Sequence, residues 1–208
     1  MKKTNKFLIY FLITFVINVS SNQTNHIQTI YLGSGCFWGA EKGYEALDGV
    51  IDAESGYANG YGIKPNYRSI IQFKNKYKEN NFAEVVKVTF NSNAITLHEI
   101  LKHFFETHDP TQLNRQGNDI GTQYRSAIYY TNENNYKIIL SSKEQYQKEL
   151  NKKNLGLIET EIKMIDSYFY AEQYHQQYLA SAGSRQYCSA SPTKVKFCLL
   201  YTSDAADD

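Results

Sequence analysis

Cys36 is the residue of this sequence whose type and position are best suited to chemistry. The β-branched run from Ile27 to Leu32 predicts a strand, a Gly-Ser-Gly turn follows, and Cys36 then begins a helical pattern that runs to Leu47. A cysteine in the first turn of a helix lies at the positive end of the helix dipole, which favours the thiolate over the thiol. Cys36 is therefore a candidate nucleophile.

The cysteine count leaves a structural role for Cys36 equally open. Unpaired cysteine is among the residue types most often buried. The chain contains three cysteines, Cys36, Cys188 and Cys198. If the last of these belongs to a foreign tail, as argued below, the other two form an even pair, which in an exported chain usually means a disulfide. A catalytic assignment therefore needs further evidence.

The elements that must position Cys36 alternate along the chain. Further strands are predicted at residues 50–57, 85–90, 124–131 and 158–165, a helix at 134–152, and loops at 58–67 and 114–123. Gly49 ends the first helix. Another helix begins at a capping box, Thr96 with Glu99, and its apolar face carries Leu97, Ile100, Leu101, Phe104, Phe105 and His108. We expect an α+β fold: a two-layer α/β sandwich of the ferredoxin-like (α-β plait) type, with a mixed sheet and an extended C-terminal coil.

The two ends of the 208-residue chain differ from the part between them. Residues 1–21 combine three lysines with the apolar run Phe7 to Val19, which predicts a secretory signal peptide and export to the periplasm, the secretory pathway or the exterior. An uncleaved signal would anchor the protein in a membrane. The last residues, CLLYTSDAADD at 198–208, back-translate in frame into a transposon-end adapter used in sequencing libraries, so we expect an artefactual tail. One catalytic domain at 27–197 remains.

Six blocks of this sequence resemble the signature of the class A peptide methionine sulfoxide reductases. The resemblance covers roughly residues 28 to 197. The blocks occur in the family's order: GCFWGAE at 35–41, NYR at 66–68, AEVV at 83–86, HDPT at 108–111, NRQGNDIGTQYRSAIY at 114–129 and AEQYHQQYL at 171–179. One short motif could arise by chance, but six in order identify a similar protein.

The resemblance implies a role for each matching residue. Cys36 would attack the sulfur of methionine S-sulfoxide and become a sulfenic acid. Glu84 would be the acid that donates to the sulfoxide oxygen, because a buried carboxyl stays protonated. The other matches are Tyr67 and Tyr124 as phenols that bind the same oxygen, Asp119 as the acid of the surrounding hydrogen-bond network, Phe37 and Trp38 as the wall for the S-methyl group, and Tyr178 and Tyr187 near the site.

Recycling of the sulfenic acid would use Cys188. Its segment, RQYCSASPTKVKF, is similar to the C-terminal part of family members with one resolving cysteine, so Cys188 would form a disulfide with Cys36. The resemblance further implies reduction of that disulfide by an external thioredoxin-like dithiol, no bound cofactor, and a role in the repair of oxidised proteins. We expect a monomer.

Two positions depart from the family pattern. Phe82 stands where many members carry a histidine, directly before the AE pair, so any role of that histidine is absent here. Phe169 stands where tyrosine is usual, in the segment YFYAE. Neither change affects the chemistry implied above.

Composition excludes some partners and leaves two rival functions. A formal charge of +1 argues against binding to nucleic acid. The sequence contains no HExxH motif and no paired-cysteine spacing that would predict a metal site. A Cys-His hydrolase would pair Cys36 with His108 or His175 as base and would need no reductant. An exported binding module, rich in aromatic residues with 18 Tyr, would use a Cys36–Cys188 disulfide only for structure.

Overall fold

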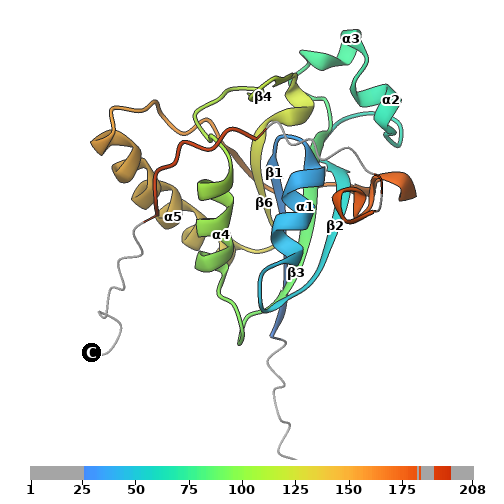
Figure 1. The fold of residues 1–208 in the computed structure, drawn as a ribbon. Coiled ribbons are helices and arrows are strands. Elements are labelled where there is room, and N and C mark those ends of the chain that lie inside the picture. Colours follow the sequence, from blue (N-terminus) through green and yellow to red (C-terminus); the bar gives the residue numbers. More distant parts are fainter. Residues whose placement is uncertain (1–25, 182, 184–189, 198–208) are drawn as a thin grey trace, which may run out of the picture.

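A computed structural model describes residues 26–181, 183 and 190–197, and Figure 1 shows how its elements are arranged. In chain order they are β1 (Ile27–Ser34), α1 (Phe37–Glu45), β2 (Val50–Ala58), α2 (Tyr67–Ile70), α3 (Phe73–Lys76), β3 (Ala83–Asn91), α4 (Leu97–Thr107), β4 (Arg115–Gln116), β5 (Asp119–Ile120), the 3-10 turn η1 (Thr122–Tyr124), β6 (Ser126–Tyr130), α5 (Glu133–Lys152), β7 (Glu161–Met164), β8 (Tyr168–Tyr170), η2 (Gln173–His175) and η3 (Tyr178–Ala180).

A mixed six-stranded sheet forms the centre of the molecule. Its strand order is β7-β6-β1-β3-β2-β8. The β6-β7 pair is parallel and the other four pairs are antiparallel. A separate two-stranded ribbon joins β4 to β5. The α+β class and the mixed sheet that the sequence predicted are confirmed.

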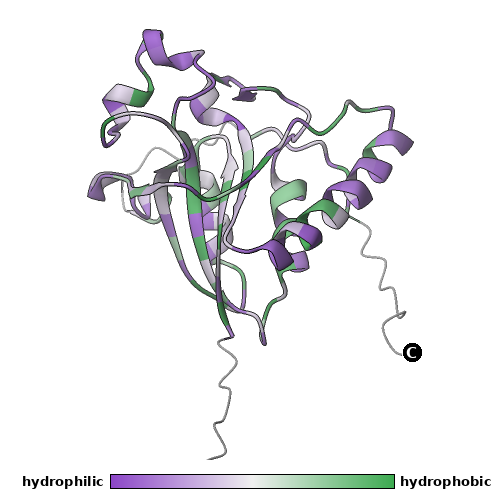
Figure 2. Ribbon diagram, turned by 180° about the vertical axis from the view of Figure 1, so that it is seen from behind, coloured by the Kyte–Doolittle hydropathy of each residue, from purple (hydrophilic) through white to green (hydrophobic). Residues whose placement is uncertain are grey.

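Helices cover one face of this sheet. Figure 1 shows α1 and α4 in front of the strands and α5 beside α4, whereas Figure 2 shows the strands from behind with no helix over most of them. The main core lies under the helices, and a smaller cluster, which includes Val85, Ala127 and Tyr129, lies on the other face. Both faces of β3 are covered along its first half, Ala83 to Val86, which is fully buried, whereas half-buried and buried residues alternate from Lys87 to the end of the strand.

Local sequence signals explain the helices that frame the site. Thr96 accepts from the backbone N–H of Glu99, whose carboxylate accepts in return from the N–H of Thr96, so the predicted capping box is confirmed. The predicted apolar positions of α4 are all buried, and the adjoining His108 is buried too. The helix predicted to run to Leu47 ends earlier: α1 stops at Glu45, Ala46 caps it in the right-handed region, and Gly49, with φ +96°, lies in the turn before β2.

The predicted loops contain short elements that the sequence pattern did not indicate. Residues 114–123 hold β4, β5 and most of η1, and β8 adds an edge strand to the sheet. The prediction of a strand at 124–131 was wrong at Tyr124, which belongs to η1. The reason lies in Arg125, whose guanidinium donates to the carbonyls of Thr122 and Asn81 and holds the turn before the strand begins at Ser126.

Among the described residues, no helix combines the length and the apolar character needed to cross a membrane. The predicted signal peptide and the predicted artefactual tail lie outside the described residues.

Candidate active site

Cys36 lies between the end of β1 and the start of α1, where it is the N-cap residue of the helix and is partly exposed. Gly35 makes this junction possible. Its φ of +92° disfavours any side chain, and a Cβ added there would lie 2.6 Å from the side chain of Gln116. The turn therefore brings the thiol to the surface of a cavity at the positive end of the helix.

Glu84 faces the same cavity from β3. Its carboxyl is only 1% exposed, its Oε2 accepts from the backbone N–H of Phe37 at 3.3 Å, and its buried Oε1 has no hydrogen-bond partner among the described residues. Burial, opposed by the bond from Phe37 and assisted by the negative charge of Asp119, raises the pKa of Glu84 to about 8. The carboxyl is therefore protonated at neutral pH, and one of its oxygens makes no hydrogen bond within the described residues.

Two phenols complete the polar side of the cavity. Tyr67 begins α2, Tyr124 ends η1, and the two hydroxyls are hydrogen-bonded to each other. Burial, followed by the neighbouring charge of Glu84, raises the pKa of both phenols. Both are therefore neutral hydroxyls. Because Tyr124 donates to Tyr67, the hydroxyl of Tyr67 keeps its own proton to donate to an oxygen in the cavity.

Aromatic rings form the apolar side. Trp38 stacks on Tyr178 with 3.9 Å between ring centroids, and its indole N–H donates to Nδ1 of His175 at 3.0 Å. The ring of Phe37 is buried and lies 5.2 Å from the His175 ring. These contacts fix the indole of Trp38 in one orientation beside the cysteine.

The cavity itself is small, about 70 Å³. It is lined by seven of the residues that the sequence analysis singled out: Cys36, Phe37, Trp38, Tyr67, Glu84, Asp119 and Tyr124. Tyr178 lies behind Trp38 and does not line it. The predicted residues Tyr187 and Cys188 lie outside the described residues.

Supporting residues that the sequence analysis did not assign hold this arrangement in place. Glu172 accepts from the Tyr57 hydroxyl at 2.7 Å and from the backbone N–H of Tyr67 at 3.0 Å. Glu41 accepts from the backbone N–H groups of Ser55 at 3.3 Å and Gln177 at 2.8 Å. Glu41 follows Phe37 by four residues on one helix face, a spacing that could have indicated a buried carboxyl. Glu172 lies in the block AEQYHQQYL, but its contacts with Tyr57 and Tyr67 are visible only in the structure.

Neither histidine of the hydrolase alternative is placed to activate the thiol. His108 is fully buried, and its two ring nitrogens bond the Phe104 carbonyl and the Ser126 hydroxyl. His175 accepts the indole proton on Nδ1, so in the neutral ring Nε2 carries the proton and no lone pair remains for a thiol. Neither residue lines the cavity.

A metal ion has no evident ligands in the part of the chain that the structure describes. No group of three or more His, Cys, Asp or Glu side chains there could hold one.

Comparison with known proteins agrees with this site. The sequence model of the family described as peptide methionine sulfoxide reductase matches residues 28–203, which extends past Phe197 into the last segment. The chain is 42% identical to the peptide methionine sulfoxide reductase MsrA of Vibrio vulnificus, over 86% of this chain and 83% of that one. It is 45% identical to the mitochondrial peptide methionine sulfoxide reductase of Homo sapiens, over 81% and 69%.

Solved structures give the same result. The reduced form of Mxr1 from Saccharomyces cerevisiae superposes with a TM-score of 0.70 at 35% identity, covering 80% of this chain and 92% of that one. Methionine sulfoxide reductase A of Corynebacterium diphtheriae superposes with a TM-score of 0.65 at 36% identity, covering 76% of each chain. The chain therefore belongs to the class A peptide methionine sulfoxide reductases, the family of peptide-methionine (S)-S-oxide reductases.

Proposed function

We propose that this protein reduces methionine S-sulfoxide, free or within proteins, to methionine, with Cys36 as nucleophile. The observation that carries the proposal is the buried carboxyl of Glu84. Its pKa of about 8 keeps it protonated, one of its oxygens has no hydrogen-bond partner among the described residues, and Glu84 lines the same cavity as Cys36. A sulfoxide sulfur is a poor electrophile until its oxygen receives a proton or a strong hydrogen bond, and Glu84 can supply both.

The proposed first step conserves atoms and charge. The Cys36 thiolate attacks the sulfoxide sulfur, the S–O bond breaks, the oxygen passes to the Cys36 sulfur, and the proton of Glu84 ends on that oxygen. The substrate sulfur gains two electrons and leaves as methionine, while Cys36 becomes a sulfenic acid. Tyr67 and Tyr124 would hold the oxygen, Asp119 would support their hydrogen-bond network, and Phe37 and Trp38 would hold the methyl group.

The proposed second step returns the enzyme through Cys188. The Cys188 thiol attacks the Cys36 sulfenic acid, a disulfide forms, and water leaves. A thioredoxin-like dithiol then reduces the disulfide and becomes oxidised itself. Support for such a donor comes from the solved structure of Mxr1 from Saccharomyces cerevisiae in complex with Trx2. This chain matches that structure with a TM-score of 0.51 at 29% identity.

The decisive experiment supplies each sulfoxide epimer to residues 22–197 with dithiothreitol and measures methionine. We expect methionine from the S epimer, and Cys36→Ser should abolish its release. A Cys188→Ser variant with thioredoxin, thioredoxin reductase and NADPH should release about one methionine per enzyme, because its sulfenic acid is not resolved. No methionine from either epimer would refute the function, and sustained turnover of Cys188→Ser with thioredoxin would refute the resolving role.

Two further proposals concern the fold and the location of the protein. We infer that β1, α1, β2, β3, α4 and β6, whose strands lie in the order β6-β1-β3-β2, form a ferredoxin-like core to which β7 and β8 are added. We also infer export through residues 1–21, so the dithiol donor must act in the same compartment. Fusion of residues 1–30 to a reporter that is active only after export tests the second of these.

A further inference from the structure

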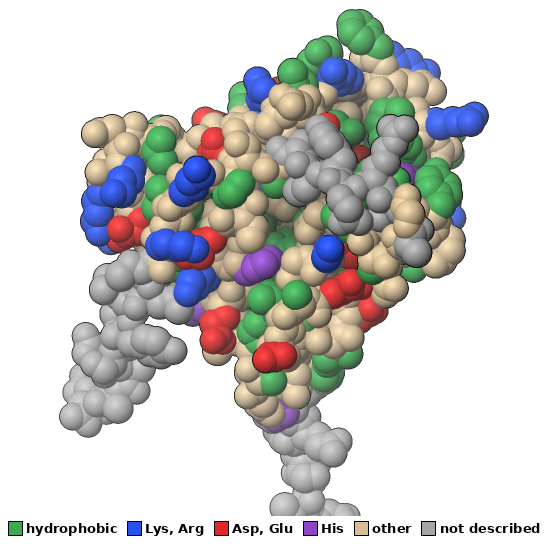
Figure 3. Space-filling model, in the orientation of Figure 1, with side chains coloured by type: hydrophobic (Ala, Val, Ile, Leu, Met, Phe, Trp, Pro, Cys, Tyr) green, Lys and Arg blue, Asp and Glu red, His purple; other side chains and the backbone are tan. Residues whose placement is uncertain are grey.

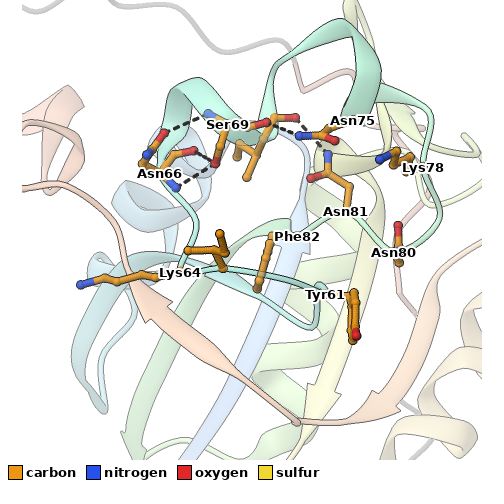
Figure 4. A pocket seen from close by; sticks show the side chains of 11 residues that line it. Tyr61, Lys64, Asn66, Ser69, Asn75, Lys78, Asn80, Asn81 and Phe82 are labelled. Atoms are coloured by element: carbon orange, nitrogen blue, oxygen red, sulfur yellow. Dashed lines mark hydrogen bonds between the residues drawn. The ribbon is translucent and has the colours of Figure 1, made fainter.

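A second and larger pocket adjoins the active site, between the loop that precedes α2 and the segment that precedes β3 (Figure 4). Its volume is about 440 Å³. We name it the α2–α3 pocket; its walls include Tyr61, Ile63, Lys64, Asn66, Lys78 and Phe82.

The walls of the α2–α3 pocket are held by hydrogen bonds. Asn75 donates to the carbonyl of Ser69 at 2.6 Å, and the buried Asn81 donates to the carbonyl of Ile70 at 3.0 Å, so both asparagines bind the end of α2. Phe82 is buried and would meet any side chain at Gly60 at 2.3 Å. The pocket is therefore formed before any ligand arrives, which lowers the entropy cost of binding.

Large apolar side chains stand exposed around this pocket. Tyr61 is 84% exposed, Ile63 93%, Phe73 82% and Tyr77 61%. Single exposed apolar residues are common, but four from one 17-residue stretch, residues 61–77, form a patch of the kind that marks an interaction site. The patch suits a partner that carries aliphatic or aromatic side chains.

Positive charge is concentrated in the same stretch. Residues 60–82 carry Lys64, Arg68, Lys74, Lys76 and Lys78 against the single acid Glu79, although the whole chain has a formal charge of only +1. Figure 3 shows Lys and Arg side chains beside hydrophobic ones along the upper edge of the molecule, over α2 and α3. The partner that complements this surface carries acidic as well as apolar side chains.

Consecutive residues connect the α2–α3 pocket to the catalytic cavity. Asn66 lines the pocket and Tyr67 lines the cavity. Neighbouring Cα atoms are about 3.8 Å apart, and an extended peptide advances about 3.3 Å per residue. A polypeptide whose oxidised methionine occupies the cavity therefore reaches the α2–α3 pocket with residues only a few positions away.

We propose that the α2–α3 pocket binds an acidic, apolar-containing segment of an unfolded protein substrate, next to its oxidised methionine. The proposal rests on the proposed function and adds a sequence preference to it: the enzyme favours methionine sulfoxide flanked by Asp or Glu and a large apolar residue. Methionine sulfoxide as a single amino acid is too short to reach the pocket and gains nothing from it.

The test compares two ten-residue peptides with one methionine S-sulfoxide each. The acidic peptide carries Asp, Glu and Leu three to six residues from the oxidised methionine, and the basic peptide carries Lys in place of Asp and Glu. Each peptide is made in two versions, with these residues before or after the methionine. We expect kcat/KM for the acidic peptide to exceed that for the basic one by about tenfold, as for a few partly exposed charge pairs. Because exposed charges are screened, the ratio should fall in 0.5 M NaCl.

Charge reversal locates the effect. In Lys64→Glu/Lys78→Glu the acidic peptide should lose its advantage, measured as its kcat/KM relative to that of single methionine S-sulfoxide in the same preparation. The neutral variant Lys64→Gln/Lys78→Gln should lie between. The matched control Lys137→Glu/Lys148→Glu makes the same change in net charge on exposed lysines of α5, which Figure 1 places on the opposite side of the molecule, and should keep the preference.

Equal kcat/KM for the two peptides, or an equal effect of both double reversals, would overturn the pocket proposal. Reduction of single methionine S-sulfoxide in those experiments would show that the proposed function stands while the pocket proposal fails. Absence of methionine from every substrate would instead count against the proposed function.

Discussion

Glu84 combines two properties that oppose each other in most proteins. A carboxyl usually lies at the surface as an anion, whereas here burial raises the pKa of Glu84 to about 8 and the fold spends only one hydrogen bond, from the Phe37 amide, on its oxygens. The remaining oxygen is costly to the fold unless a ligand uses it. A buried carboxyl of this kind lowers the stability of the fold and is typical of functional sites.

The state of Glu84 predicts how activity depends on pH. In the proposed mechanism the acid form of Glu84 donates the proton, so kcat/KM should fall as pH rises through about 8. Replacement Glu84→Gln should lower kcat/KM by about 10² to 10⁴, the usual contribution of a general acid. Its remaining activity should lack the fall near pH 8. A pH profile of wild type and variant checks this, and an unchanged profile in Glu84→Gln would assign the titration to another group.

The size of the catalytic cavity predicts selectivity for the group on sulfur. A volume of about 70 Å³ leaves little room beyond the sulfinyl oxygen and a methyl group between Trp38 and Phe37. Ethionine S-sulfoxide, with one extra methylene, should therefore be reduced with kcat/KM lower by about 10-fold or more. Competition between the two sulfoxides in one assay measures the ratio of their kcat/KM values. Equal consumption would show that Phe37 and Trp38 do not limit the size of the group on sulfur.

At the scale of elements, α1 and the segment after β8 depend on each other. Glu41 on α1 is 1% exposed, and its carboxyl accepts from the amide of Gln177, next to the Tyr178 that stacks on Trp38. Burial raises the pKa of Glu41 to about 7, against the lowering effect of the Gln177 and Ser55 amides. The acceptor strength of this anchor therefore increases as pH rises through about 7.

Loss of this anchor should be visible in Trp38, which is the single tryptophan of the chain. In Glu41→Gln the amide NH₂ would face a backbone donor, so we expect a free energy of unfolding lower by about 1 to 3 kcal/mol and a change in Trp38 fluorescence. Residue 45 supplies a control, since Glu45→Gln alters an exposed glutamate of the same helix. If Glu41→Gln had the emission of wild type, the anchor would not position the indole.

The elements that sequence could predict are those with a periodic apolar pattern or a local stop signal. The strand before Cys36, the helix after it and α4 meet that condition. The four-residue helix α2 does not: it is held by a capping box at Asn66 and by the tertiary hydrogen bond that the Tyr67 amide donates to Glu172. The three-residue strand β8 exists through its pairing with β2. Elements this short depend on partners distant in sequence, which a pattern cannot show.

The candidate site was predictable because its residues lie in blocks shared with the family. The supporting Glu41 and Glu172 lie in two of these blocks as well, but the amides they bind, of Gln177 and Tyr67, are distant in sequence, so their roles were not predictable. The two departures from the family pattern also have a spatial explanation that sequence could not provide. Phe82 and Phe169 contact each other edge to face, with 5.7 Å between centroids. Phe82 lines the α2–α3 pocket, and both rings line a neighbouring pocket beside Gly60, where an apolar pair stands in place of the usual histidine and tyrosine.

For the whole molecule, His108 makes stability depend on pH. Burial, only partly offset by the Phe104 carbonyl and Asp109, lowers the pKa of His108 to about 4 from 6.5. Between these values the unfolded chain binds a proton that the folded chain does not, so this residue's contribution is complete above pH 6.5 and is lost as pH falls toward 4. At about 1.4 kcal/mol per pH unit the loss amounts to about 3 kcal/mol.

Urea unfolding of wild type and His108→Gln at several pH values isolates this contribution. The variant should be less stable at pH 7, because the bonds to Phe104 and Ser126 are altered. The free energy of unfolding of wild type minus that of the variant should fall by about 3 kcal/mol between pH 6.5 and 4. A difference that stays constant with pH would mean that His108 does not titrate in this range.

The hydrogen bonds that Glu172 and His175 accept, and the one that the Gln177 amide donates, also have a consequence for biosynthesis. These groups fix Tyr67, Trp38 and Glu41, yet they are among the last parts of the domain to leave the ribosome. A nascent chain carries Cys36 long before it carries the residues that shape the pocket around it. The proposed nucleophile is thus synthesised early and its supporting residues late, so we expect the nascent chain to become reactive toward sulfoxides only when synthesis of the domain is almost complete.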